Sequence, residues 1–232
     1  MDRKQRNLLM KVLKLLQQEG LLEHLIVAGS WCIYFYKFYY NKRQSIATLR
    51  TRDVDFFIPS PKAIKIEIDL PELLKHLGFI IDFQGRAGYI RFVHPELFIE
   101  FLVPERGRSI DKPYPLKQLK INAQPLRFLE ILQLKTINVK VKDFDLTLPH
   151  PSCFVLHKTI VYKRRPKKDK RARDIEQIIR VLDFIQKQNE LDSLAEVYSQ
   201  LHSKWQNKII SNLNEIGQVN IAKLLEKPKK VN

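Results

Sequence analysis

Two stretches of the chain decide which fold the sequence indicates: VAGSW at residues 27–31 and LRTRDVDFFIP at residues 49–59. The first stretch is an apolar run followed by Gly29 and Ser30, which indicate a turn. The second contains an apolar strand that has Asp53 and Asp55 near its start. In a strand, residues two apart point to the same side, so Asp53 and Asp55 are expected on one face. Neighbouring carboxylates repel each other unless a cation neutralises them. Mg²⁺ suits this role because it typically takes one or two carboxylates together with substrate phosphates.

A third acid has a similar setting. Glu100 lies within LFIEFLVP, residues 97–104, which is otherwise apolar. A carboxylate is almost never fully buried without a partner. If this strand lies beside the one that carries Asp53 and Asp55, three carboxylates meet, enough for the two metal ions that stabilise the attacking and leaving oxygens of a phosphoryl displacement.

The Gly29–Ser30 turn has a matching use. A turn of small residues before a helix leaves backbone N–H groups free to bind phosphate, assisted by the helix dipole. Each of these motifs also has a structural interpretation: Ser30 as a helix N-cap, the two aspartates as partners of Arg50 and Arg52, and the strand glutamate as half of a salt bridge. If Arg50 and Arg52 do not pair with the aspartates, we expect them to contact phosphate or the acceptor.

Charge and cysteine content narrow the function classes. The chain of 232 residues has a formal net charge of +16, with 44% hydrophobic and 28% charged residues. This is globular composition with a field that draws polyanions such as nucleotides or nucleic acid. Cys32 and Cys153 each lie in an apolar stretch, which argues against a disulfide framework. Residues 1–20 have an amphipathic helical pattern and no apolar run spans a bilayer, so we expect a soluble cytoplasmic protein with no membrane partner.

Hydrophobic periodicity predicts an α/β fold. Apolar runs bounded by turn residues indicate strands, and segments with helical spacing lie between them, which predicts a mixed sheet flanked by helices. The expected strands are residues 25–28, 54–58, 79–83, 89–93 and 97–103, with a strand or hairpin over 139–148. After residue 150 only helical patterns remain. The predicted domains are therefore residues 1–148 and a helical domain, residues 149–232.

Taken in order, Gly29-Ser30, Asp53-Val-Asp55 and Glu100 resemble the signature of the nucleotidyltransferase superfamily of the DNA polymerase β type. In that signature Gly-Gly or Gly-Ser precedes an Asp-x-Asp strand and a later acidic strand. Longer segments resemble, in the same order, a bacterial branch known only as nucleotidyltransferases. These segments are RTRDVDFFIP, IEFLVP, AQPLRFLEIL and LPHPSCFVLHKTIVYKRRPKKDKRARDIEQ.

The resemblance implies a role for each matching residue. Asp53 and Asp55 would hold two Mg²⁺ ions, with Mn²⁺ as a substitute, and form the nucleotidyltransferase site of the first domain. Glu100 would hold the catalytic ion and accept the proton of the attacking hydroxyl. Gly29 and Ser30 would cradle the β and γ phosphates of an NTP.

Three basic residues complete the expected site. The resemblance implies that Lys158, in the LHK segment, neutralises triphosphate charge from the opposite side of a cleft between the two domains. Arg50 and Arg52 are expected nucleotide contacts. The structural alternative for Lys158 is a solvent-facing helical lysine.

We therefore expect a metal-dependent transfer of a nucleoside monophosphate from an NTP to an acceptor, with release of pyrophosphate. The basic run KRRPKKDKRARD, residues 163–174, is either a nucleic-acid contact or a solvated loop, so the acceptor class stays open among RNA or tRNA, protein and small molecules. Two alternatives are a catalytically inactive nucleic-acid-binding module and a toxin-like transferase that modifies tRNA. The sequence specifies neither the NTP nor an oligomeric state.

Overall fold

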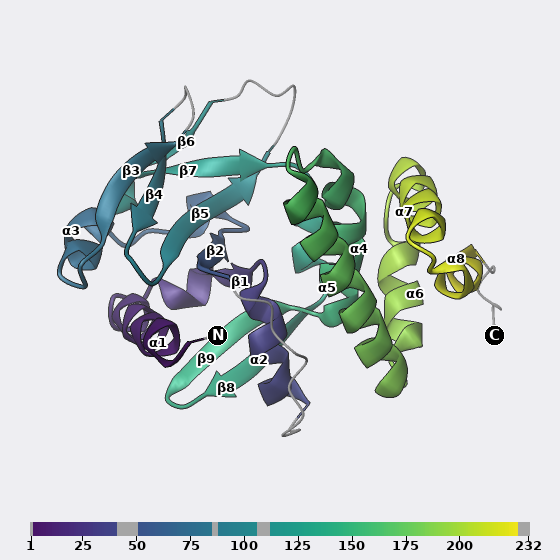
Figure 1. Cartoon of the computed structure of the whole chain (residues 1–232). Coiled ribbons are helices and arrows are strands. Elements are labelled where there is room, and N and C mark those ends of the chain that lie inside the picture. Colours follow the sequence, from purple (N-terminus) through teal and green to yellow (C-terminus); the bar gives the residue numbers. More distant parts are fainter. Residues whose placement is uncertain (1, 41–50, 85–87, 106–111, 227–232) are drawn as a thin grey trace. The chain divides into compact units, whose positions relative to one another are not determined.

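The computed structural model describes residues 2–40, 51–84, 88–105 and 112–226 (Figure 1). Contacts between residues divide the chain into two compact units. Unit 1 comprises residues 1–130 and 136–148, and unit 2 comprises residues 131–135 and 149–232. The assignment of two domains stays a prediction. In the described ranges, no helix combines the length and the apolar character that crossing a membrane requires.

Unit 1 is built on one mixed sheet, which confirms the predicted architecture. The strands lie in the order β3-β4-β5-β2-β1-β9-β8, and β7 pairs with both β5 and β6. Strands β2, β5 and β7 are parallel, whereas β1 is antiparallel to β2, and β4 is antiparallel to β3 and β5. The bounds are β1 (Ile26–Ala28), β2 (Asp53–Phe57), β3 (Ile80–Gln84), β4 (Tyr89–Val93), β5 (Phe98–Pro104), β6 (Tyr114–Leu116), β7 (Ile121–Leu126), β8 (Thr136–Val141) and β9 (Phe144–Pro149).

Three α-helices accompany this sheet in the described part of unit 1: α1 (Arg3–Gln18), α2 (Trp31–Tyr39) and α3 (Leu70–Lys75). The first begins with a capping box, in which Asp2 and Gln5 each accept a backbone N–H of the other. Its apolar stripe is buried, and the side chain of Gln5 donates to the carbonyl of Glu96 in the turn between β4 and β5. The chain leaves α1 through Gly20, whose φ of 67° lies in the left-handed region.

The two faces of the central strands differ in chemistry. Val54 and Phe56 on β2, with Ile99 and Phe101 on β5, are buried on one face, and the rings of Phe56 and Phe101 stack at 5.5 Å. Burial of side chains of this size contributes about 2 kcal/mol each, so this face fixes the pairing of the strands. The alternate residues of the same strands lie on the other face, and they include all three predicted site acids.

Unit 2 is helical in its described part, as the sequence predicts for the C-terminal segment. Its α-helices are α4 (Pro151–Val161), α5 (Lys168–Lys187), α6 (Leu191–Ser199), α7 (Ser203–Glu215) and α8 (Val219–Glu226). Helices α4 and α5 lie side by side (Figure 1). His150 is the N-cap of α4, and its imidazole accepts the backbone N–H of Ser152 at 3.2 Å. The His150 side chain is only 2% exposed, and this burial lowers its pKa to about 4.

Candidate functional site

The parallel pairing of β2 with β5 brings the three acids to one face. Asp55 lies directly opposite Glu100, and Asp53 lies opposite Phe98, two residues along the same strand. Because directly opposite residues of paired strands point to the same side, Asp53, Asp55 and Glu100 share this face. Their side chains keep contact with water, since Asp53 is 44% exposed and Glu100 is 21% exposed. The condition that the sequence analysis placed on Glu100, a strand beside Asp53 and Asp55, is met.

The Gly29 turn lies against the same carboxylates. Strand β1 pairs with β2 so that Ala28 is opposite Asp55, and Gly29 follows with a φ of 68°. A Cβ on Gly29 would overlap with Oδ2 of Asp55. Position 29 therefore requires glycine for two reasons: its backbone is left-handed, and the Asp55 carboxylate fills the space that a Cβ would take.

Helix α2 begins directly after this turn, at Trp31. Ser30 is its N-cap, but the Ser30 side chain makes no capping hydrogen bond, and the first-turn contact is the Cys32 N–H donating to the Gly29 carbonyl at 3.2 Å. The backbone N–H groups of a first helical turn are the usual anion-binding groups of such a site. The turn therefore places the N-terminus of α2 next to Asp55, and the predicted contact of this turn with phosphate stays a prediction.

One residue of this face was missed by the sequence analysis. Arg91 on β4 is opposite Glu100 on one side and Asp82 of β3 on the other. Its Nε donates to Glu100 Oε1 at 2.6 Å, and its terminal nitrogen lies 3.9 Å from Asp53 Oδ1. A row of charged residues therefore crosses four strands: Asp82, Arg91, Glu100 and Asp55. The signal that singled out Glu100, a charge inside an apolar strand, is equally present in YIRFV at residues 89–93.

The two predicted arginine contacts have different outcomes. The Arg52 guanidinium lies over the ring of Phe98 at 4.2 Å and donates to the carbonyl of His94 at 3.2 Å. These contacts hold Arg52 beside the acidic strands, and its role toward phosphate stays a prediction. Arg50 lies outside the described residues.

The carboxylates match the preference of Mg²⁺ for oxygen ligands. Asp53 and Asp55 supply two carboxylates on one face, which together with phosphate oxygens is a typical Mg²⁺ ligand set. Glu100 is engaged by Arg91 at 2.6 Å, and among the described residues no three His, Cys, Asp or Glu side chains are grouped so as to hold a metal ion. The residues therefore fit an ion that is shared between two aspartates and a nucleotide, whereas Glu100 does not join them in this arrangement.

Comparison with known families decides the assignment. A family model described as nucleotidyltransferase matches residues 7–203, which is most of the chain. The chain belongs to the nucleotidyltransferase family. This confirms the resemblance seen in the sequence and supports nucleotidyl transfer as the general activity. No curated protein matches the chain.

Two solved structures are similar to this nucleotidyltransferase at low identity. The antibiotic-resistance factor ANT(2'')-Ia is 11% identical with a TM-score of 0.44, and the similarity covers 97% of this chain and 90% of that one. An antigenic nucleotidyltransferase-like protein from Paracoccidioides brasiliensis is 13% identical with a TM-score of 0.48, covering 93% and 91%.

Lys158, the predicted triphosphate contact of the nucleotidyltransferase, lies in unit 2. It is 5% exposed, and its ammonium group donates to Asp174 at 2.5 Å. Asp174 also accepts from Arg165 at 3.1 Å. Burial raises the pKa of Asp174, but the two cations outweigh burial and leave that pKa below its usual value. Lys158 is therefore neither solvent-facing nor free of partners within its own unit, and its contact with phosphate stays a prediction.

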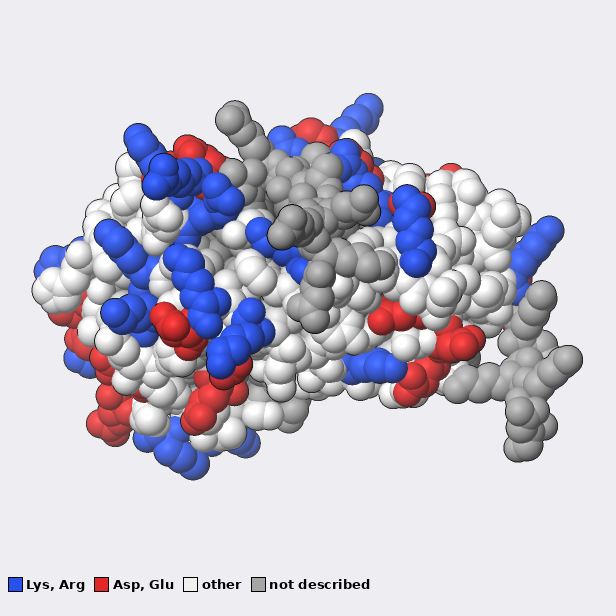
Figure 2. All heavy atoms as spheres, turned by 90° about the horizontal axis from the view of Figure 1, so that it is seen from below, with Lys and Arg blue, Asp and Glu red and all other residues white. Residues whose placement is uncertain are grey.

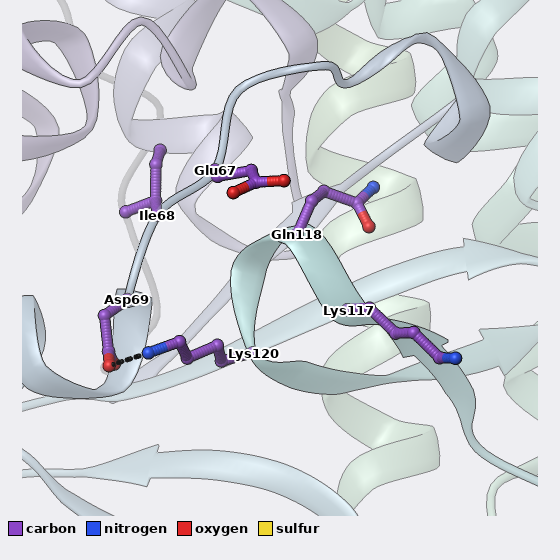
Figure 3. Close-up of a pocket in the computed structure, with 6 residues that line it drawn as sticks. All are labelled: Glu67, Ile68, Asp69, Lys117, Gln118 and Lys120. Atoms are coloured by element: carbon purple, nitrogen blue, oxygen red, sulfur yellow. Dashed lines mark hydrogen bonds and ion pairs between the residues drawn. The ribbon is translucent and has the colours of Figure 1, made fainter.

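A separate pocket of about 550 Å³ in unit 1 of the nucleotidyltransferase is lined by none of the predicted site residues. It lies between the segment Glu67–Asp69 and the segment that contains Lys117, Gln118 and Lys120 (Figure 3). Its best-defined contact is an ion pair of 2.6 Å between Lys120 and Asp69, and the hydrogen bond from Lys120 lowers the pKa of Asp69. The pocket offers no acid cluster comparable with that of β2 and β5.

Proposed function

We propose that the chain transfers a nucleoside monophosphate from a Mg²⁺-bound NTP to a hydroxyl group of an RNA acceptor. The observation that carries this proposal is the register in which Asp55 lies opposite Glu100, with Asp53 on the same face and Gly29 against Asp55. The folding of a sheet does not call for three acids on one side of it beside a left-handed glycine, whereas metal-assisted phosphoryl transfer uses carboxylates grouped in this way.

The chemistry assigned to the site is one in-line displacement. The acceptor oxygen forms a bond to the α-phosphorus, the bond from that phosphorus to the bridging oxygen breaks, and pyrophosphate leaves. The proton of the acceptor hydroxyl passes to Glu100. Bound Mg²⁺ would neutralise phosphate charge, with Asp53 and Asp55 as its protein ligands. Gly29 and Ser30 bind the β and γ phosphates through backbone N–H groups, and this positioning lowers the barrier.

A set of lysines on unit 2 supports RNA as the acceptor class. Lys167, Lys168 and Lys170 are exposed at the start of α5, and none of them forms an ion pair with an acid in the described residues. Cations at a helix N-terminus are unfavourable because that end of the helix dipole is positive. The fold therefore gains nothing from these lysines there, whereas a phosphate backbone would.

The wider charge distribution agrees with a polyanionic partner. The chain has a net charge of +16, and Figure 2 shows one face on which lysine and arginine side chains outnumber acidic ones to the eye. Such a field speeds the encounter with RNA and makes binding sensitive to salt.

The test of the transfer reaction uses each labelled NTP in turn with Mg²⁺ and total cellular RNA or protein. The double variant Asp53→Asn/Asp55→Asn should lose both label transfer to RNA and Mg²⁺-dependent NTP binding. The matched control is Asp143→Asn/Asp145→Asn, which makes the same change at two exposed aspartates of unit 1 that are also two residues apart. Unchanged Mg²⁺–NTP binding in the first variant would contradict the proposal.

The test of the acceptor class is the salt dependence of RNA binding. Lys168→Gln/Lys170→Gln should weaken binding and reduce the salt slope by about 2, since each phosphate contact contributes about 1. Lys11→Gln/Lys14→Gln on α1 removes the same charge from exposed positions and serves as the control. Label found only on protein or on a small molecule would overturn the RNA assignment. RNA binding with no transfer by any NTP would favour the inactive binding module.

A further inference from the structure

Arg91 lies against acids that are candidates for binding a metal ion. It contacts two of the three site acids, with Nε 2.6 Å from Glu100 and a terminal nitrogen 3.9 Å from Asp53. The 2.6 Å contact is a short hydrogen bond between charged groups, which is among the stronger side-chain interactions. The Arg91 side chain is only 24% exposed, so water screens this pair incompletely.

The backbone holds Arg91 in this place. The pairing of β4 with both neighbours puts its Cα opposite Glu100 on one side and Asp82 on the other. The ring of Phe98 lies 5.2 Å from the guanidinium carbon and restricts its other side. An arginine that is fixed by register, ring and carboxylates is preorganised, so little side-chain entropy opposes its contact with Glu100.

We infer that Arg91 is a positioning residue. In the resting site its guanidinium is paired with the Glu100 carboxylate, and it competes with a divalent cation for that carboxylate. The inference rests on the proposed function, because it concerns the same acids. In the resting site the guanidinium pairs with Glu100 at 2.6 Å and lies 3.9 Å from Asp53, so a divalent cation that approaches these carboxylates meets its positive charge. A cation that recruits Glu100 must displace the guanidinium, which the negative charge of a bound triphosphate favours by giving Arg91 another anionic partner.

The first test measures Mn²⁺ binding to the full chain without nucleotide, by electron paramagnetic resonance of the free ion. Arg91→Met removes the charge and keeps much of the side-chain volume, and it should bind Mn²⁺ about tenfold more tightly than the wild type. Arg91→Lys keeps the charge and should stay near the wild-type affinity. Arg91→Met/Glu100→Gln should lose the gain, because the released ligand is then no longer a carboxylate.

The matched control is Arg127→Met. Arg127 also pairs with a glutamate of unit 1, Glu105, at 3.4 Å beyond the end of β5, so this variant removes the same charge and a similar ion pair elsewhere. Equal Mn²⁺ affinity in Arg91→Met and Arg127→Met would overturn the inference, because a general charge effect would then explain any change. Circular dichroism of each variant checks that it has folded.

A second measurement uses the wild-type chain and does not depend on how Arg91→Met folds. Titration with Mg²⁺ alone should shift the nuclear magnetic resonance signal of the Arg91 Nε–H group, which is assigned by its absence from the Arg91→Lys spectrum. A signal that stays in place while Mg²⁺ binds would overturn the inference. Failure of the proposed function looks different, since Asp53→Asn/Asp55→Asn would then bind Mg²⁺–NTP like the wild type.

Discussion

Gly29 leaves open the space that the carboxylate of Asp55 occupies. Asp55 is on β2, opposite Ala28 at the end of the antiparallel neighbour β1, and Gly29 follows Ala28 in the turn with a positive φ. Any side chain at position 29 would push Asp55 from its place, because its Cβ would overlap with Oδ2. The turn and the acid therefore form one structural element.

Gly29→Ala should therefore abolish Mg²⁺-dependent NTP binding. The left-handed backbone adds a loss of stability of about 1 kcal/mol for an alanine. Gly20→Ala is the control, because Gly20 has nearly the same φ, 67° against 68°, and a Cβ at position 20 would meet no atom within 4 Å. Both variants should lose similar stability in urea denaturation, and only Gly29→Ala should lose NTP binding by calorimetry. Equal binding by the two would show that the Asp55 carboxylate does not need its position.

Asp174→Asn should destabilise the protein by about 3 kcal/mol, because it leaves the buried ammonium of Lys158 without its charged partner. The control lies on the same helix, where Asp183 pairs with Lys187 and is 58% exposed. Asp183→Asn should change stability by less than about 0.5 kcal/mol, since water screens that pair. Urea denaturation monitored by circular dichroism measures both. A small loss in Asp174→Asn would mean that the buried pair contributes little.

The stability of unit 2 should fall as the pH drops from 6.5 toward 4. His150 has an ordinary pKa of 6.5 when unfolded and a pKa of about 4 when folded, so the unfolded state binds the proton first. The stability that neutral His150 provides is complete above pH 6.5, falls by up to about 3 kcal/mol, and levels off below pH 4. Burial lowers the pKa of His157 to about 3, so His157 adds to the same loss of stability as the pH falls.

His150→Asn isolates the share of His150. Asparagine can still accept the Ser152 N–H as an N-cap, but it does not titrate. The free energy of unfolding should therefore depend less steeply on pH in this variant between pH 6.5 and 4. An identical slope in the variant and the wild type would assign the whole effect to His157 and other groups.

Phe83→Lys should leave the stability within about 0.5 kcal/mol and reduce self-association. Strand β3 lies at the end of the strand order, and Ile80 and Phe83 are 67% and 65% exposed on it. An edge strand with exposed apolar side chains can pair with another chain, and a lysine opposes this. Analytical ultracentrifugation at increasing concentration measures the effect. Equal association of both proteins would show that β3 is not the contact.

The sequence predicted the parts of unit 1 whose apolar runs are uninterrupted. Strands β2, β4 and β5 follow clear apolar runs, and their bounds lie within one residue or so of the expected ones. Strands β6 and β7 were not predicted, because Pro115 and Pro125 interrupt short segments that show no clear alternation. Helix α5 begins at Lys168, before the apolar periodicity becomes visible, since its first turn carries charges and no apolar residue that a periodicity could reveal.

The candidate site was predictable in its acids and unpredictable in their partners. Alternation along β2 placed Asp53 and Asp55 on one side, but only strand pairing shows that Glu100 is opposite Asp55 and that Arg91 is opposite Glu100. The burial of Lys158 against Asp174 depends on how α4 packs on α5, which a single sequence does not encode in any local pattern.

The register between β2 and β5 has a consequence for folding. Sliding β5 by one residue would turn Glu100 into the apolar layer and expose Ile99 to solvent, so misaligned sheets would be penalised by an unsolvated charge. The acids proposed for catalysis thereby also favour the correct register of β2 and β5 while the sheet forms. Selection for activity and selection for correct strand pairing would then converge on the same side chains.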